Sequence, residues 1–377
     1  MNMARSPALA LLVLAASPAA AAEEPRPLDY GITLATGYDS NPLHLAERGA
    51  GAAYADLRGA LAGRLEVGRG TELFASGAAT TRVHERRAHD ADASYGDVKA
   101  GVHWTNRASR RVDISAAGRF TAARSTFTDR LTGDVYVSGA PLPDRFDSNT
   151  TGGLVEIRWA PQRRLRLQLG TEYERRSYVE DYAGIEGVDP LDSSAWLVTP
   201  RVRILVSQTV AIEAGADWSS RTYDALPAVD ASGGPVEGVA RRDRGTAWRV
   251  TVDARPSSRW DVSAGVIAAG RRDLEAGYFD TRGQSAYVLA GMKAGRTGRV
   301  QIYGSLQNLD YPQATLTNDP NAPHRGSDAL RTLARYERPL RPGVTFATEA
   351  GIQRTGNRDP LYAYDRDWIQ TAIRFKR

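Results

Sequence analysis

The sequence predicts an all-β chain that forms a transmembrane antiparallel β-barrel of about sixteen strands. Three observations lead to this fold class. Apolar and polar residues alternate in segment after segment, the connections between segments are alternately short and long, and the N-terminus has the features of an export signal. Strand ends inferred from sequence carry errors of about two to four residues, so totals of about 14 to 18 strands also fit the pattern.

The N-terminal residues 1–22 predict a secretory signal peptide that is removed from the mature chain. Arg5 supplies a short basic region, residues 8–16 are apolar, and the small residues ending at Ala22 fit a cleavage site. Because about 20 apolar residues are needed to span a bilayer, the length disfavours the alternative of a retained anchor. Residues 23–377 are expected to form a single barrel without disulfides, since the sequence has no cysteine.

Each expected strand is long enough to cross a membrane, which requires only about 9–11 tilted residues. In chain order the expected strands cover residues 28–39, 52–67, 72–86, 94–106, 111–125, 150–160, 164–179, 194–206, 209–223, 245–255, 259–272, 282–294, 298–310, 327–339, 343–355 and 366–376. In one of them Trp248, Val250 and Val252 share one face, whereas Arg249 and Asp253 share the other. Charge on alternate residues, with a period of two, indicates a strand with one apolar face rather than a helix.

The connections fall into two classes, which predicts that the two rims of the barrel face different compartments. The short class comprises the turns at 68–71, 107–110, 161–163, 207–208, 256–258, 296–298 and 341–342. The long class is rich in Gly, Pro and Asp and comprises 40–51, 87–93, 126–149, 180–193, 224–244, 273–281, 311–326 and 356–365. We expect the short turns and both termini at the periplasmic rim. The longest connection, 126–149, is expected either to fold inward as a constriction or to cover the outside.

Alternation fits a soluble antiparallel sheet as well as a membrane barrel, and the tryptophans help to decide between them. Most of them fall close to the ends of expected strands, namely Trp104, Trp159, Trp196, Trp218, Trp248 and Trp260. Amphipathic rings occupy such positions in the interfacial girdles of membrane barrels. Together with the export signal and the segregated loops, they predict that the chain resides in the bacterial outer membrane, in contact with its lipid and lipopolysaccharide.

The sequence contains no arrangement of residues that predicts catalysis or metal binding. Its five histidines form no H-E-x-x-H helix or metal-ligand cluster, and no G-x-S-x-G elbow is present. The stretch 317–321 is rich in Asn and Asp but lacks the spacing of a calcium loop and fits turn chemistry. The net charge of +5 is spread along the strands, which excludes a nucleic-acid patch. We therefore expect no catalytic residues, no metal and no cofactor, and the chain is not expected to be an enzyme.

Alternate residues of barrel strands face the lumen, and in this chain those positions are rich in charge. The residues predicted to line the pore are Arg58, Lys99, Arg119, Arg166, Glu172, Arg201, Arg203, Glu213, Asp217, Arg249, Asp253 and Arg255. Sixteen strands leave room for an aqueous channel, whereas about eight are filled by side chains. The sequence thus predicts a porin-like channel that passes solutes through a charged lumen, with a mild preference for anions because arginine is in excess. The alternative is that these charges pair across strands and close a narrow barrel.

The exit of the first strand, Gly37–Pro42, has the sequence Gly-Tyr-Asp-Ser-Asn-Pro and resembles the opening of the β-barrel porins of type 2 and of exopolysaccharide-associated outer-membrane porins. The resemblance implies an integral outer-membrane channel, with exopolysaccharide export assisted by periplasmic export proteins as an alternative to passive diffusion. The last strand is expected to engage the barrel-assembly machinery, although Lys376 and Arg377 follow Phe375, the aromatic residue that usually ends such chains. The remaining alternatives are a closed-lumen outer-membrane enzyme or adhesin, and a secreted soluble β-protein.

Overall fold

The structure is a computed structural model, and it describes most of the expected barrel. The described residues are 28–42, 51–106, 111–125, 136–137, 140–141, 147–179, 191–316, 321–358, 360 and 363–377. The predicted signal peptide, residues 1–22, lies outside the described residues and stays a prediction. Most of the connection 126–149 also lies outside them, so its predicted place inside or outside the barrel is untested.

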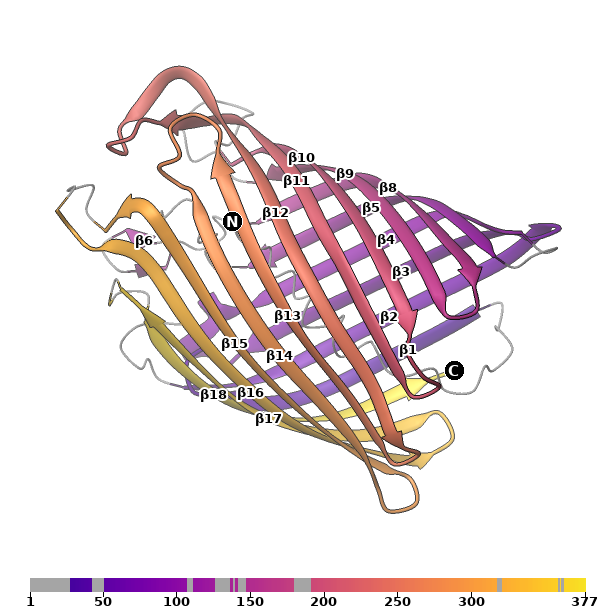
Figure 1. Cartoon of the computed structure of the whole chain (residues 1–377). Coiled ribbons are helices and arrows are strands. Elements are labelled where there is room, and N and C mark those ends of the chain that lie inside the picture. Colours follow the sequence, from indigo (N-terminus) through magenta and orange to yellow (C-terminus); the bar gives the residue numbers. More distant parts are fainter. Residues whose placement is uncertain are drawn as a thin grey trace.

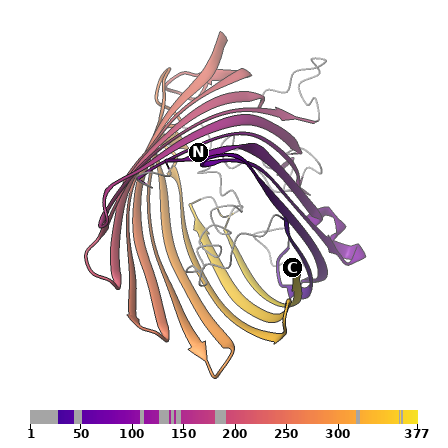
Figure 2. The ribbon, with the colours of Figure 1, turned by 90° about the vertical axis from the view of Figure 1, so that its right-hand side faces the viewer.

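Sixteen antiparallel strands in the described part of the chain form one closed barrel (Figure 1). They are β1 (Leu28–Asp39), β2 (Ala52–Gly68), β3 (Thr71–His84), β4 (Ala93–Thr105), β5 (Val112–Ser125), β8 (Ser148–Gln162), β9 (Leu165–Tyr178), β10 (Ser193–Leu205), β11 (Val210–Val229), β12 (Pro235–Ser257), β13 (Trp260–Asp273), β14 (Thr281–Ala294), β15 (Gly298–Thr315), β16 (His324–Arg341), β17 (Val344–Asn357) and β18 (Tyr364–Lys376). Each strand pairs with its neighbour along the wall, and β1 pairs with β18 to close it. Figure 2 shows the wall as one sheet that curls round on itself. The predicted fold class is confirmed.

Three short elements of the described residues lie outside the wall. The 3₁₀ segment η1 (Arg86–Ala91) follows β3, and the strands β6 (Tyr136–Val137) and β7 (Ala140–Pro141) pair only with each other. None of the helical segments in the described residues has the length and apolar character needed to cross a bilayer.

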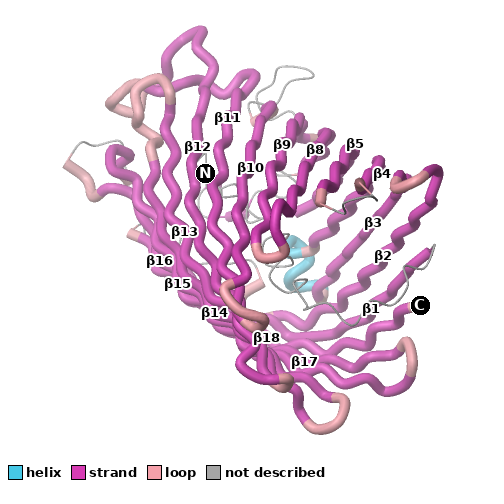
Figure 3. The backbone as a smooth tube through the Cα atoms, turned by 45° about the vertical axis from the view of Figure 1, so that its right-hand side comes forward, coloured by secondary structure: helices cyan, strands magenta, loops and turns pink. Residues whose placement is uncertain are grey.

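Two expected loops are instead largely strand, and here the prediction was wrong in detail. The stretch 224–244 continues β11 and β12 into a hairpin, which projects past the neighbouring strands (Figures 1 and 3). Residues 311–315 and 324–326 of the other expected loop likewise extend β15 and β16. Proline and glycine suggested loops, but proline is tolerated at irregular or edge positions of a sheet. The register of the longer hairpin does shift on both sides of Pro227.

The tip of the β11–β12 hairpin is built around Asp230. One carboxylate oxygen accepts hydrogen bonds from the Ser232 hydroxyl at 2.6 Å, the Ser232 backbone N–H at 2.8 Å and the Gly234 backbone N–H at 2.9 Å. The intervening Gly233 has φ of 86°, a conformation that glycine adopts without strain. The carboxylate therefore adds to the backbone hydrogen bonds of the turn, which join Asp230 N–H to the Gly234 carbonyl at 2.8 Å and Gly233 N–H to the Asp230 carbonyl at 3.0 Å.

We expect the hairpin tip to loosen in acid. The hydrogen bond from the Ser232 hydroxyl, followed by those from the Gly234 and Ser232 backbone N–H groups, holds the pKa of the Asp230 carboxyl below its ordinary value. A lowered pKa means that the stabilisation is present above the ordinary aspartate range and is lost as the pH falls through the lowered value. Acid or Asp230→Ala should speed proteolysis within 229–235 and leave the heat-dependent gel mobility of the barrel unchanged. Equal proteolysis of the wild type and the variant at neutral pH would contradict this role.

The barrel carries its apolar residues on the outside. On every wall strand, exposed large apolar side chains alternate with charged, polar or small ones, as Trp248 and Val250 at 60% and 44% exposure flank Arg249. Because alternate residues of a closed barrel face lipid and lumen, the apolar face is the outer one. The six tryptophans predicted to form girdles are all exposed on it, at 37–60%.

At the long-loop rim, a small apolar core lies between the strand extensions. It consists of Val229, Tyr278, Tyr311 and Ala314. Beside it, Asp243 lies 3.2 Å from Arg241 and 3.3 Å from Arg271, all three nearly inaccessible to solvent. The Arg241 guanidinium also stacks 4.2 Å from the Phe279 ring centre. The packing at this end of the barrel therefore resembles the interior of a soluble protein.

The seam between the first and last strands is fastened at the same rim by residues of the stretch Gly37–Pro42. Asp39 is completely buried and accepts a hydrogen bond from Arg366 Nε at 2.8 Å. Asn41 donates its backbone N–H to Asp39 at 3.1 Å and its amide Nδ2 to the Asp365 carbonyl at 3.0 Å. The polar residues of this stretch thus have a structural role, which is to hold β1 against β18.

Candidate functional site

The candidate site is the inner face of the barrel. All twelve residues that were predicted to line a pore lie on wall strands (β2, β4, β5 and β9 to β12) at positions that alternate with the outward apolar residues. Their side chains therefore point inward. Most of them are joined in cross-strand networks rather than standing alone.

The first network spans β10, β11 and β12. Asp217 on the middle strand forms ion pairs with Arg201 on one side and Arg249 on the other. Nearer the short-turn rim, Arg203 lies 2.8 Å from Asp253. Alternating signs on adjacent strands stabilise a sheet face and leave little net charge on it.

A second network joins β4, β5 and β9. Arg119 donates from Nε to Asp97 at 2.6 Å and lies 3.5 Å from Glu172. Lys99, on the same inner face, lies with its ammonium group 5.7 Å from the centre of the Phe74 ring. This wall is again close to electrically balanced.

A third network lies beside the seam, and sequence reasoning found only part of it. Asp56 accepts hydrogen bonds from Arg58 at 2.7 Å, Arg82 at 2.7 Å and Gln370 at 3.2 Å. The Arg82 guanidinium also stacks over Tyr54, 4.0 Å from the ring centre. Arg82 was not among the predicted pore residues, although its inward position follows from the alternation of β3.

At the short-turn rim the balance of charge is lost. A pocket of about 390 Å³ lies there, and half of the residues that line it are arginines, namely Arg111, Arg163, Arg164, Arg166 and Arg203. Arg166 and Arg203 lie directly opposite each other in the register, so like charges face one another. Arg203 is compensated by Asp253 and by Glu213 at 3.5 Å. For Arg164, Arg166 and the exposed Arg255 we find no ion pair among the described residues, so this sector of the short-turn rim is positive.

Large inward rings lie flat against the wall because each sits opposite a glycine. The pairs are Tyr54 with Gly37, Tyr287 with Gly265, and Trp368 with Gly351. A Cβ built on Gly265 would lie only 2.6 Å from the Tyr287 ring, and the other two glycines are equally crowded by their partner rings. The absence of a side chain at these positions lets the rings turn aside from the barrel axis.

We expect Gly265→Ala to lift the Tyr287 ring off the wall, because the added methyl group occupies the space of the ring. The displaced ring should lower single-channel conductance and disturb the 3.0 Å hydrogen bond between Tyr287 and Thr251. Gly304→Ala on β15 is the matched control, since a Cβ there meets nothing within 4 Å. Equal conductance of the two folded variants would show that the ring does not control the bore.

The described residues contain no group of three His, Asp or Glu side chains placed to hold a metal ion. Near His103, Nε2 lies 3.0 Å from the Thr105 hydroxyl, which donates to Asp113 at 2.8 Å. This small polar chain lies on the inner face with the other networks.

Comparison of the sequence with protein-family models and with curated proteins finds no match. Solved structures do resemble the fold. A loop-deletion mutant of OmpT, an outer membrane protein of Vibrio cholerae, aligns with a TM-score of 0.51 at 11% identity, covering 93% of this chain and 99% of that one. CdiB from Acinetobacter baumannii gives 0.52 at 8% identity, covering 93% of this chain and 60% of that one. An anion-selective porin from Comamonas acidovorans gives 0.47 at 11% identity, covering 93% and 98%. At these identities the likeness concerns the fold, and the chain is an outer-membrane β-barrel, located in the bacterial outer membrane.

Proposed function

We propose that the barrel is a passive, porin-like channel with a preference for anions. The observation that carries this proposal is the arginine-lined pocket at the short-turn rim, where Arg164 and Arg166 have no compensating acid among the described residues. The other inner-face networks are nearly balanced. A channel with one positive mouth would concentrate anions at that mouth without binding them tightly along the wall.

The number of strands, sixteen, and the inward side chains that lie against the wall support a water-filled path through the barrel. Most inward arginines are held by acids on neighbouring strands, and the large rings Tyr287 and Trp368 sit over glycines. Transport would then be diffusion down a gradient, with no covalent step and no cofactor. Since the field of exposed arginines is screened by salt, the preference should fade as ionic strength rises.

The direct test is single-channel recording of the refolded chain in a planar bilayer, with a salt gradient across it. We expect stable conductance steps and a reversal potential of the anion-preferring sign that shrinks toward zero at high salt. Heat-dependent gel mobility confirms that the protein used is folded. Electrical silence from folded protein would overturn the channel, whereas conductance with cation preference would overturn only the role of the arginines.

A second candidate is the export of a polysaccharide chain, as the resemblance of Gly37–Pro42 implies. It is favoured by one sector of the inner face. Within the described stretches 263–269, 283–289 and 301–307 no charged side chain points inward, and Tyr287, Tyr303 and two glutamines do. Aromatic and neutral polar groups suit a neutral polyhydroxylated chain. We expect a neutral oligosaccharide to block the current if this use is correct, with the block weakened by Tyr303→Ala.

A further inference from the structure

Three arginines form a row on the outer face of the barrel, at the long-loop side of its apolar band. Arg244 on β12 lies directly opposite Arg272 on β13, and Arg282 on β14 lies opposite Gly270, one step along the same face. All three are exposed. Like charges placed directly opposite each other destabilise a sheet.

These three arginines differ from other outward arginines near the long-loop rim. Arg242 pairs with Glu275 at 2.8 Å, Arg354 with Asp367 at 2.7 Å and Arg358 with Asp310 at 2.9 Å. Among the described residues we find no ion pair for Arg244, Arg272 or Arg282. Acidic residues therefore neutralise the nearby outward arginines, whereas the row formed by Arg244, Arg272 and Arg282 stays positive.

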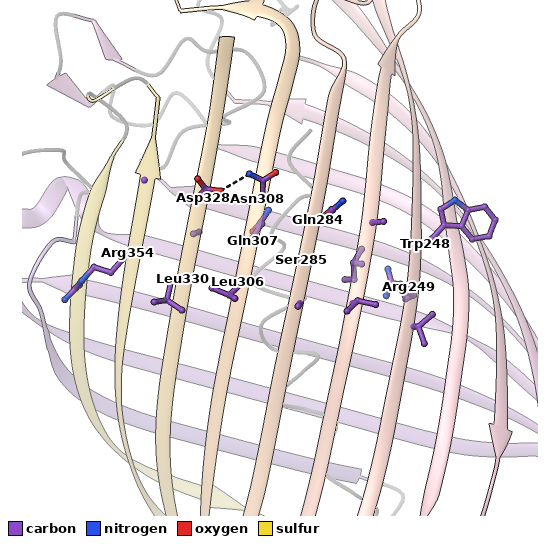
Figure 4. Close-up of a pocket in the computed structure, with 17 residues that line it drawn as sticks. Trp248, Arg249, Gln284, Ser285, Leu306, Gln307, Asn308, Asp328, Leu330 and Arg354 are labelled. Atoms are coloured by element: carbon purple, nitrogen blue, oxygen red, sulfur yellow. Dashed lines mark hydrogen bonds between the residues drawn. The ribbon is translucent and has the colours of Figure 1, made fainter. Parts of the chain in front are cut away.

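A groove of about 780 Å³ lies on the same outer face, on the membrane side of the row (Figure 4). Trp248 on β12 lies at one end of the groove and Arg354 on β17 at the other, with β13 to β16 between them. Small side chains such as Ala268 and Ala286 form part of its lining, and Leu306 lies beside them. The lining is mostly apolar, as expected of a surface that faces lipid.

The polar edge of the groove faces the arginines. Asn308 donates from Nδ2 to Asp328 at 2.8 Å, as Figure 4 shows, and Gln284 lies beside Asn308 in the register. Arg282 is two residues beyond Gln284 on the same face, which places it about 7 Å farther along the strand toward the long-loop rim. Arg244 is four residues beyond Trp248, or about 13 Å along its strand. Positive charge, neutral polar groups and apolar groove thus follow one another along these strands.

We propose that this surface binds one phosphorylated glycolipid of the outer leaflet, a lipopolysaccharide. Its phosphate groups would be held by Arg244, Arg272 and Arg282, its sugars would meet Gln284 and Asn308, and an acyl chain would lie in the groove. The order of these chemical groups along the strands matches their order in such a lipid. A bound phosphate also removes the repulsion between Arg244 and Arg272, and guanidinium–phosphate contacts are the strong, charge-assisted kind.

The test uses the full-length folded barrel in detergent and purified diphosphorylated lipid A as the probe. Lipid retention is followed by native mass spectrometry, and stability by the temperature at which the folded gel band is lost. A variant with Arg244, Arg272 and Arg282 all changed to Gln should bind lipid A at least about tenfold more weakly. The matched control changes Arg259, Arg296 and Arg338, which are exposed at the opposite rim, and should bind as the wild type does.

Stability without lipid separates recognition from a structural role. Lipid-free, the triple variant should be as stable as the wild type or more so, because like charges have been removed. Only the wild type and the control should be stabilised by lipid A. Dephosphorylated lipid A should stabilise these two proteins less. Equal binding by the triple variant and the control, or equal binding of the dephosphorylated lipid, would overturn the proposal.

A second variant probes the groove without touching charge. Ala268→Leu with Ala286→Leu fills the groove and should weaken lipid A binding while the arginines remain. The wild-type barrel could instead retain no lipid A and form oligomers that the groove-filling variant does not form. That result would make this surface a contact between copies of the chain and would overturn the lipid assignment.

Discussion

Changing Arg164 and Arg166 to Glu is expected to turn the anion preference of the channel into a cation preference. Both side chains line the pocket at the short-turn rim, and no ion pair compensates them among the described residues. Each change replaces a positive charge by a negative one at the mouth of the barrel, where the local field sets the concentration of entering ions. We expect the ratio of chloride to potassium permeability to fall by about tenfold or more at low salt, with a smaller fall at high salt.

The control for this experiment carries the same change in charge outside the pocket. Arg259 and Arg296 lie in turns at the same rim and are exposed. Changed to Glu, they should leave the reversal potential close to that of the wild type. If both double variants shift the reversal potential equally, general surface charge sets the selectivity and the arginine pocket has no special part.

Asp39→Ala is expected to give the largest loss of stability among single substitutions at the seam. The substitution leaves Arg366 without its buried acceptor and removes the acceptor of the Asn41 backbone N–H. Breaking a buried ion pair by removing one partner typically costs about 3–5 kcal/mol, and partial solvent access of Arg366 places the expected cost at about 2–3 kcal/mol. The loss of the fast-migrating folded gel band at lower temperature, and a lower urea midpoint, would measure it.

Asp29→Ala is the matched control, because Asp29 faces inward at the other end of β1 and has no ion pair among the described residues. Asp39→Asn should fall between the two, since an amide oxygen still accepts one hydrogen bond but carries no charge. Equal melting of the Asp39 and Asp29 variants would mean that the backbone pairing of β1 with β18 alone closes the barrel.

The wall of the barrel could be predicted from sequence because each strand carries its own signal. Alternation of Trp248, Val250 and Val252 with Arg249 and Asp253 fixes both the strand and the face that meets lipid. Every predicted pore residue accordingly has the inward register. The extension of β11 and β12 could not be predicted, because Pro227 and the glycines near Gly233 suggest a loop when their pairing partners are unknown.

The arginine clusters on the inner and outer faces depend on the register between strands. The sequence of a single strand does not determine that register. Arg166 meets Arg203 only because β9 and β10 pair at that offset. Arg244 meets Arg272 for the same reason on the outer face. A shift of two residues would preserve every apolar face and dissolve both clusters. Sequence patterns therefore gave the individual candidates, and the pairing of the strands decides which of them act together.

The seam between β1 and β18 has a consequence for how the barrel folds. Ser40 and Asp367, which exchange hydrogen bonds there, are 327 residues apart in the chain. All other wall pairings join wall strands that are consecutive along the chain, so they form by closing a single connection, with little loss of chain entropy. Ring closure must then be a late and slow step, preceded by a curved open sheet with two unsatisfied edges. Folding kinetics should show hairpin signals first and a separate, later phase for contact between the two chain ends.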